Sequence, residues 1–407
     1  MKKNLAISLL VLFVAYAALE VTFLSWFPRL LPTAFVLSAT DEGLHPALQS
    51  SKRSTIPQHY IALLGDSHAQ GMGDWATEAM KEPMARYGTA HLLQQATGRD
   101  VVSFGSAGAG SVRGIVTEPL TQLAYLRRYV NGEFPDPDVA LVYFYEGNDL
   151  YDNAAYFHYS FPRLYDIAHQ HDAATYREYL QRFAIDRDDT WRLAQSYDPW
   201  RFLPFSHLLD KVARTIAGKP LREEPLPPGY DASLDPPWIM GAAMYREPGT
   251  INRALIGGQE QQLPDQLQGP ALGLTDEETR QAWFALEQAL LFTRQQLPDT
   301  RFVLVYIPSV ASCYSLVSEQ VSVQPYERRE TAFPTAKLLA RSLAMRETVR
   351  GIAQSQGLPL IDTTDAMRTA ASAAPLHGPG DWNHPNRQGY EVLSRAIASG
   401  LQPLLQE

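Results

Sequence analysis

Four short polar segments contain the side chains of this 407-residue chain that could do chemistry. They hold Ser67, the cluster Gly105–Gly110, Asn148, and the pair Asp381 and His384. A serine becomes a nucleophile when a histidine takes its proton and a carboxylate fixes the tautomer of that histidine. The oxyanion that forms needs N–H donors, which a glycine turn and an asparagine amide supply. The set predicts ester cleavage, although each residue alone has a structural interpretation, such as a helix N-cap or a surface histidine.

The segments around these residues resemble four sequence blocks of the SGNH or GDSL hydrolases. In chain order they are Leu64-Gly65-Asp66-Ser67-His68-Ala69, Ser103-Phe104-Gly105-Ser106-Ala107-Gly108, Gly147-Asn148-Asp149 and Asp381-Trp382-Asn383-His384-Pro385-Asn386. The resemblance covers about residues 60–149 and 274–401 and keeps the family's order. Four blocks in order are a specific signal, whereas any one of them would be weak.

The resemblance implies a catalytic triad and an oxyanion hole. Ser67 is the expected nucleophile, His384 its general base, and Asp381 the residue that orients the base. The expected oxyanion donors are the backbone N–H groups of Ser67 and Gly108 and the side chain of Asn148.

Two positions depart from the common pattern of the family. Its second block often has an asparagine where Ser103 stands, which leaves Gly105 as an alternative oxyanion donor. His68, after the nucleophile, resembles the Gly-Asp-Ser-His motif of SGNH domains that are attached to membrane acyltransferases. O-acyl transfer therefore stays open beside hydrolysis.

Four more residues near the blocks are candidates for substrate binding: Asp66, His68, Arg113 and Trp382. Asp66 is more typical of a structural turn residue than of a catalyst. Arg113 could contact an anionic or polyhydroxy ligand, and a surface salt bridge would explain it equally well.

Metal and cofactor chemistry find little support in the sequence. The segment His169-Gln170-His171-Asp172 contains possible ligands, but a polar loop before a helix is the favoured interpretation. Cys313 is the only cysteine, which excludes an internal disulfide and a cysteine-based zinc site. We expect it to be a small buried residue, and we predict no cofactor and no metal.

Alternating apolar runs and amphipathic segments predict an α/β fold with a central parallel sheet. The expected strands are residues 59–64, 101–104, 139–145, 302–307 and 359–362, and the expected helices are 84–97, 117–130, 275–296, 336–356 and 387–401. The family resemblance implies a three-layer, flavodoxin-like version of this fold. Ligands of such sheets bind at the carboxyl ends of the strands. Three of the polar segments follow the first three strands, and the fourth lies in the loop before the last helix.

Residues 151–274 interrupt the alternation, and we interpret them as a mainly helical insertion or cap on the functional edge of the sheet. Helices are expected near residues 173–194 and 203–217, before a proline-rich stretch from Pro220 to Pro237. Trp191, Trp200 and Trp238, together with several tyrosines, would suit stacking on sugars. The hydrolase domain would thus consist of residues 59–150 and 275–407.

The amino-terminal residues predict export. Leu5–Phe27 is an apolar stretch preceded by Lys2 and Lys3 and long enough to span a bilayer. The favoured interpretation is a transmembrane signal anchor over residues 1–27, followed by a linker over residues 28–58. The alternative is a cleaved signal peptide, which Glu20 favours because a carboxylate is costly inside a membrane. A buried core helix is a third, disfavoured possibility.

The overall composition and charge exclude some classes of protein. With 45% hydrophobic residues, a net charge of -9 and no basic run, the sequence predicts a globular chain that does not bind nucleic acid. We expect a periplasmic or extracytoplasmic serine esterase that removes acyl groups, acetyl foremost, from an envelope or extracellular polysaccharide, and envelope polysaccharide machinery is a possible partner. The alternatives are an O-acyltransferase on the same kind of glycan, a lipase or thioesterase, and a non-catalytic polysaccharide-binding or scaffold subunit of an export complex.

Overall fold

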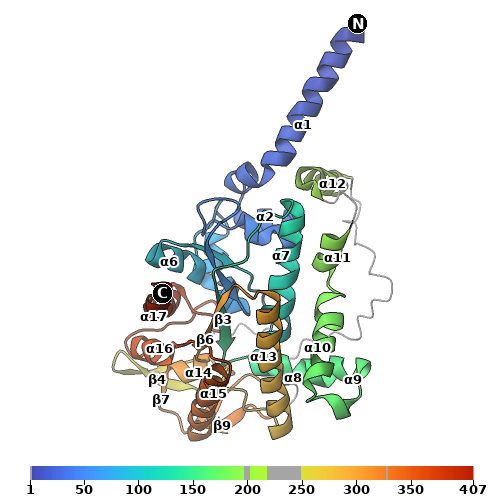
Figure 1. The fold of residues 1–407 in the computed structure, drawn as a ribbon. Helices are drawn as coiled ribbons and strands as arrows, with labels where there is room; N and C mark the ends of the chain where they lie inside the picture. The colour runs from blue at the N-terminus through green and yellow to red at the C-terminus, as the bar shows by residue number, and fades with distance from the viewer. Residues whose placement is uncertain (1, 197–201, 218–248, 327–328, 407) are drawn as a thin grey trace.

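A five-stranded parallel sheet forms the centre of the computed structural model, which describes residues 2–196, 202–217, 249–326 and 329–406 (Figure 1). The strands are β1 (Tyr60–Leu64), β2 (Asp100–Ser103), β3 (Val139–Tyr145), β6 (Arg301–Ile307) and β10 (Leu360–Asp362). They lie in the order β10-β6-β3-β1-β2, the arrangement typical of flavodoxin-like sheets. The predicted fold class and all five predicted strands are confirmed.

The order of the strands reverses beside β1, which pairs with β2 on one side and β3 on the other. Nearly every strand residue is buried, as expected of a parallel sheet that is covered on both faces. The loops after β1 and β3 therefore leave the sheet at its topological switch point, where ligands of open α/β sheets bind.

Two layers of helices cover the sheet. On one face lie α7 (Glu118–Tyr129), α13 (Asp276–Gln296) and α15 (Thr335–Ser355), which pack against one set of alternating strand side chains. On the other face lie α6 (Gly88–Thr97), α16 (Thr364–Ala371) and α17 (Arg387–Leu401). The predicted helices match these elements closely, except that the start of the second one is the π-helical segment η2 (Val112–Thr117).

The insertion differs from the prediction of a cap on the functional edge. After α8 (Asp149–Ala155), its described helices include α10 (Ala173–Tyr179) and α11 (Asp189–Gln195), which run beside α13 and α7 (Figure 1). Their apolar residues join the same core as the sheet. The described helices thus thicken one outer layer.

The described part of the insertion is mainly helical, as predicted, but it also contains β4 (Arg253–Ile256) and β5 (Gln259–Gln262), which form an antiparallel hairpin. This hairpin pairs with β7 (Ser315–Leu316), and a separate pair joins β8 (Gln320–Ser322) to β9 (Ala332–Pro334). The proline-rich stretch Pro220–Pro237, with Trp238, and Trp200 lie outside the described residues.

The expected linker over residues 28–58 is instead part of the folded body. It contains α2 (Thr33–Ala39), η1 (Glu42–Leu44) and α3 (His45–Leu48), whose apolar side chains are buried in the main core. Beyond α3, Gln49 and Ser51 hydrogen-bond the backbone of β2 and so cover this edge strand. A segment that protects a sheet edge cannot be a free linker.

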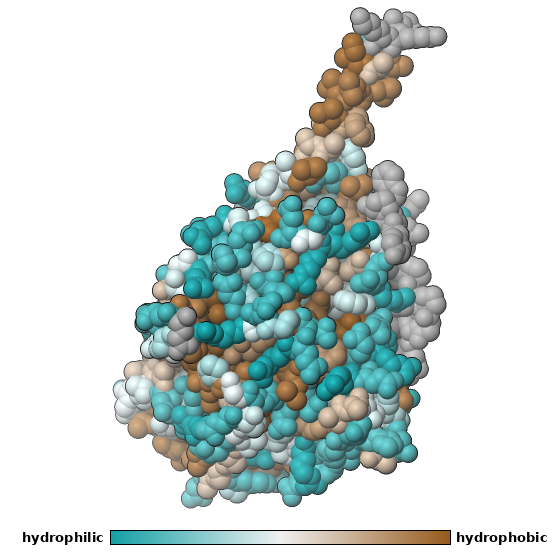
Figure 2. Space-filling view, viewed as in Figure 1, coloured by the Kyte–Doolittle hydropathy of each residue, from teal (hydrophilic) through white to brown (hydrophobic). Residues whose placement is uncertain are grey.

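The first helix, α1 (Lys2–Leu30), projects from one end of the body (Figure 1). Its residues Asn4–Leu30 have a mean hydropathy of 2.3 in their most apolar window, enough by length and composition to cross a membrane. Apolar side chains surround the projecting part (Figure 2). Most of α1 is exposed, unlike the core helix that was the third interpretation of this segment.

Candidate active site

Ser67 lies at the turn between β1 and α4 (Ser67–Gln70). Gly65 has a φ of +141° and its Cα faces the backbone of β3, where a Cβ atom would lie 3.1 Å from the Tyr143 carbonyl oxygen. Asp66 is the N-cap of α4 and accepts a hydrogen bond from the backbone N–H of His68. Ser67 is thus the first residue of a short helix, so its own N–H group has no partner within that helix.

The structure brings the three predicted triad residues together. His384 Nε2 lies 2.8 Å from Ser67 Oγ, and His384 Nδ1 lies 2.6 Å from Asp381 Oδ2. Ser67 and Asp381 are buried, whereas the His384 side chain keeps 16% of its surface exposed. The serine is therefore within reach of a base, and the base is oriented by a carboxylate and open to solvent on one side.

Burial alone would raise the pKa of Asp381, but the hydrogen bond and charge of His384 outweigh burial and lower this pKa. The Asp381 carboxylate is therefore ionised at neutral pH. An ionised carboxylate at Nδ1 stabilises the imidazolium that forms when Nε2 takes a proton from serine.

Residues that sequence analysis missed hold the Asp381 loop in place. Asp74, at the start of α5 (Asp74–Ala79), accepts hydrogen bonds from the backbone N–H groups of Gly380 and Asp381 at 2.8 and 3.1 Å. Gly73 has a φ of +129°, and a Cβ atom there would lie 3.1 Å from the Cβ atom of His384. These contacts link positions more than 300 residues apart, so no local spacing reveals them.

The two glycines expected as oxyanion donors differ in whether their backbone N–H groups already make a hydrogen bond within the protein. The alternative donor, Gly105, gives its N–H to the Ser103 hydroxyl at 3.1 Å. Gly108 adopts a left-handed conformation with a φ of +66°, and its N–H makes no hydrogen bond within the described part of the chain. This difference favours Gly108 over Gly105 as the donor.

Asn148 is buried at the N-cap of α8, and its Nδ2 atom donates to Asp152 Oδ2 at 3.2 Å. An amide nitrogen carries two hydrogens, so one N–H remains for a ligand while the other is held by Asp152. Burial and the charge of Asp66 raise the pKa of Asp152 to about 8. We conclude that Asp152 positions the Asn148 amide.

A second aspartate–histidine pair lies behind Ser67. His68 Nδ1 is 3.1 Å from Asp66 Oδ2, and the His68 ring stacks on Tyr145 with 3.7 Å between centroids. Burial alone would raise the pKa of Asp66, but the charge and hydrogen bonds of His68 lower it. Both side chains are almost fully buried, so they are not placed to contact a substrate from solvent.

The other two candidates for substrate binding have structural contacts. Arg113 forms an ion pair of 2.5 Å with Glu118 and approaches the Ser106 hydroxyl at 3.4 Å. Trp382 is partly buried beside Gly378 and Tyr314. Arg113 therefore fits the salt-bridge interpretation, and Trp382 packs within the loop that carries Asp381 and His384.

The candidates for metal or thiol chemistry, His171 and Cys313, make no contact with the three triad residues among the described residues. His171 pairs with Glu277 on α13, and Cys313 is buried in the core. Burial raises the pKa of the Cys313 thiol. Within the described residues, no group of three His, Cys, Asp or Glu side chains is arranged to hold a metal ion.

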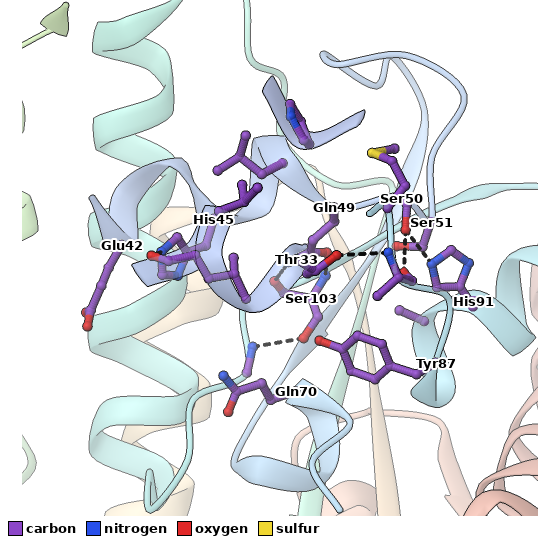
Figure 3. A pocket seen from close by; sticks show the side chains of 18 of the residues that line it. Thr33, Glu42, His45, Gln49, Ser50, Ser51, Gln70, Tyr87, His91 and Ser103 are labelled. Atoms are coloured by element: carbon purple, nitrogen blue, oxygen red, sulfur yellow. Dashed lines mark hydrogen bonds between the residues drawn. The ribbon is translucent and has the colours of Figure 1, made fainter. Parts of the chain in front are cut away.

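A pocket of about 200 Å³ lies between the folded N-terminal segment and the second sequence block (Figure 3). Gln49, Ser50 and His91 line it, and Ser50 Oγ is 2.8 Å from His91 Nε2. Ser103, Gly105 and Ser106 also line the pocket, but the triad residues do not. The pocket thus adjoins the turn that begins at Gly105, on the side of the N-terminal segment.

Comparisons with known proteins give only distant similarities. No family model matches the chain, and no curated protein matches it. It is similar to an extracellular lipase from Streptomyces rimosus, with 12% identity over 84% of this chain and 99% of the lipase and a TM-score of 0.36.

Two further solved structures show the same level of similarity. A carbohydrate esterase family 2 enzyme with a carbohydrate-binding domain, from Corynascus thermopiles (Myceliophthora fergusii), has 12% identity over 87% of this chain and 69% of its own, with a TM-score of 0.36. Phospholipase A1 from Streptomyces albidoflavus NA297 has 11% identity over 85% and 99%, with a TM-score of 0.34. Identities and TM-scores this low do not assign a function, so the functional conclusion rests on the geometry of the site.

Proposed function

We propose that this protein is a serine ester hydrolase of the SGNH type. The observation that carries the proposal is the hydrogen-bonded series Ser67 Oγ, His384 Nε2, His384 Nδ1 and Asp381 Oδ2, with distances of 2.8 and 2.6 Å between partners. It occurs at the switch point of a flavodoxin-like sheet, together with the Asn148 amide and the Gly108 N–H, which makes no hydrogen bond to another described residue. A binding or scaffold protein has no need for this complete set.

The reaction would begin as Ser67 Oγ attacks the ester carbonyl carbon and His384 Nε2 takes the hydroxyl proton. The carbonyl oxygen becomes an oxyanion that accepts hydrogen bonds from Ser67 N–H, Gly108 N–H and Asn148 Nδ2. When the ester C–O bond breaks, His384 gives its proton to the departing alcohol. Asp381 stabilises the positive charge on His384 in the meantime.

The second half of the reaction would use water. His384 takes a proton from the water as its oxygen attacks the acyl-Ser67 carbonyl. Collapse of this second tetrahedral intermediate releases the carboxylic acid and returns the proton to Ser67 Oγ. A sugar hydroxyl in place of water would give acyl transfer by the same steps. The geometry therefore supports hydrolysis and acyl transfer alike, and the molecule that accepts the acyl group determines which of them occurs.

For the substrate, we propose a small acyl ester, acetyl foremost, on an envelope or extracellular polysaccharide. The apolar helix α1 supports this proposal, because it would place the catalytic domain outside the cytoplasm as a membrane anchor, or after cleavage as a secreted enzyme. The insertion supports it less than its aromatic content suggested. Tyr176 and Tyr179 are fully buried and Trp191 is partly buried, so these rings pack the core and are not free to stack on sugars.

The test is hydrolysis of 4-nitrophenyl acetate by the purified full-length chain in detergent. We expect Ser67→Ala to abolish the activity, and Ser372→Ala, which changes an exposed serine at the end of α16, to retain it. Equal activity in Ser67→Ala and wild type would overturn the proposal. A panel of acetylated glycans and long-chain esters, with free acid and acylated sugar both measured, then distinguishes the esterase from a lipase and from an acyltransferase.

A further inference from the structure

The helix α12 (Pro204–Ile216) lies beside α1, at the end of the body from which α1 projects (Figure 1). Glu20 of α1 accepts hydrogen bonds from the backbone N–H groups of Phe205 and Ser206 at 3.0 and 2.9 Å, and also one from the Ser206 hydroxyl. The Glu20 carboxylate is buried in this contact. The amino terminus of α12 is thus fixed to one point along α1.

This contact changes the meaning of Glu20. A carboxylate within an apolar span is unfavourable when it is unpaired, and the first N–H groups of a helix are unsatisfied. Here each group satisfies the other, and the positive end of the α12 dipole favours the negative charge. The residue that favoured signal-peptide cleavage in the sequence is therefore accommodated within an intact α1.

The two ends of α12 have different surroundings along its apolar face. Phe205 and Leu208, in its first turns, pack against the core, and Phe205 also contacts Trp26 of α1. Leu209, Val212 and Ile216 are exposed, and Ile216 keeps 82% of its surface. At 100° per residue these three side chains lie on one face of the helix.

The opposite face of α12 is polar. Asp210 and Arg214 lie there and form an ion pair of 2.7 Å. An apolar face and a charged face of this kind are typical of helices that lie in the plane of a membrane interface.

The length of α1 places α12 at the level where a bilayer would begin. The part of α1 before Glu20, Asn4–Leu19, is about 24 Å long at 1.5 Å per residue. A hydrocarbon core is about 30 Å thick, so this part alone falls short of a full span. The apolar region has to extend to the level of Glu20 and α12 for α1 to cross the bilayer.

We propose that α12 is an interfacial helix, which inserts Leu209, Val212 and Ile216 into the lipid bilayer next to the point where α1 enters it. The inference rests on the proposed membrane anchor and adds a second contact with the lipid. A single transmembrane helix would let the catalytic domain rotate and tilt freely. Two contacts joined through Glu20 hold the domain at a fixed height and orientation above the membrane.

The test uses single-cysteine variants of the full-length chain in a Cys313→Ala background, labelled with an environment-sensitive fluorophore. The chain is reconstituted into vesicles of phosphatidylethanolamine and phosphatidylglycerol that carry a quencher on the lipid chains, placed near the headgroups in one set to reach α12 and near the chain ends in a second set to reach the middle of α1. Val212→Cys and Ile216→Cys probe α12, and Phe13→Cys probes the exposed middle of α1. The matched control is Leu343→Cys, an equally apolar residue on α15 that is 58% exposed.

The inference predicts a blue-shifted emission and loss of fluorescence by lipid quenching at Val212 and Ile216, and neither at Leu343. If Phe13 is quenched while Val212 and Ile216 behave like Leu343, the interfacial role of α12 is wrong and the anchor stands. If Phe13 is not quenched, both the anchor and the role of α12 are wrong. A blue shift at Val212 and Ile216 that is insensitive to lipid quenchers, in detergent and vesicles alike, would show that these side chains are buried against protein and not in lipid, and would also overturn the inference.

Discussion

Two aspartate–histidine pairs lie close to Ser67, and they differ in what the histidine faces. In the pair of Asp381 and His384, the imidazole joins the carboxylate through Nδ1 and Ser67 through Nε2. In the pair of Asp66 and His68, the imidazole also meets its carboxylate through Nδ1, but Nε2 has no hydrogen-bond partner among the described residues. The two rings are only 5.4 Å apart.

The difference between the pairs is one of access. His68 is stacked on Tyr145 and nearly without exposed surface, whereas His384 remains partly open to solvent. A general base has to receive a proton from the nucleophile and then pass it to a leaving group or take one from water. A hydrogen bond to a carboxylate is therefore not enough to make a histidine a general base. We expect His68 to stabilise the turn that presents Ser67.

The largest expected effect contrasts the two histidines. His384→Gln removes the general base, so kcat/KM for 4-nitrophenyl acetate should fall by about 10²–10⁴. His68→Gln removes a ring that packs on Tyr145, so it should lower the melting temperature and reduce kcat/KM by a much smaller factor. Steady-state kinetics and thermal unfolding of both variants measure this contrast, and equal losses of kcat/KM would break it.

The second contrast is between the two carboxylates. Asp381→Asn leaves His384 without the charge that stabilises its protonated form, and kcat should fall by up to about 10⁴. Asp66→Asn keeps the shape of the N-cap of α4 and leaves the base intact, so we expect a smaller loss of kcat. A larger loss of kcat in Asp66→Asn than in Asp381→Asn would show that the general base belongs to the pair of Asp66 and His68.

A third substitution extends the comparison from the base to the oxyanion. Asn148→Ala removes one donor while both aspartate–histidine pairs stay in place, so kcat should fall by about 10²–10³ with little change in KM. Single-turnover measurements of the acylation rate would locate the loss in the attack by Ser67. An unchanged acylation rate would exclude Asn148 from the oxyanion hole.

The smallest expected effect concerns stability and pH. Asp66 has a lowered pKa in the folded protein, so its stabilising contribution is present at neutral pH and is lost on acidification through that pKa. Burial and the charge of Asp66 raise the pKa of Asp152 from 3.8 to about 8, so the stabilising contribution of this carboxyl is full below pH 3.8 and is lost as the pH rises through about 8.

The variants should therefore change the pH dependence of unfolding in opposite directions. Relative to wild type, Asp66→Asn should lose less stability on acidification, and Asp152→Asn should gain stability as the pH rises from about 4 to about 8. Melting temperatures measured from below the lowered pKa of Asp66 to above the pKa of about 8 of Asp152 cover both titrations and give both slopes. If the melting temperatures of wild type and Asp152→Asn change in parallel with pH, the Asp152 carboxyl has an unshifted pKa and this prediction is wrong.

The sheet and its helices could be predicted from the sequence because each strand is a short apolar run and each helix has a periodic apolar face. Strand β3 occupies the residues predicted for it, and α13 matches the predicted helix 275–296, with a capping box of Thr275 and Glu278 at its start. The four polar blocks could be placed for the same reason, since three of them follow strands β1, β2 and β3 and the fourth comes directly before α17.

The sequence was less informative where short elements depend on distant partners. Val36, Leu44 and Leu48 are buried, but they lie in helices too short to show a period, so residues 28–58 resembled a linker. Gln49 and Asp74 act through hydrogen bonds to the backbone of β2 and of the Asp381 loop. A single side chain that satisfies a remote backbone leaves no pattern in the sequence around it.

The most direct test of the central claim is to locate the covalent adduct that an activated phosphonate forms with the full-length chain. If His384 activates Ser67 and the pair of Asp66 and His68 does not, mass spectrometry of peptides should find the phosphonate on Ser67 in wild type and in His68→Gln. Labelling should be nearly lost in His384→Gln and absent in Ser67→Ala. An adduct on another residue, or undiminished labelling of Ser67→Ala, would contradict the account.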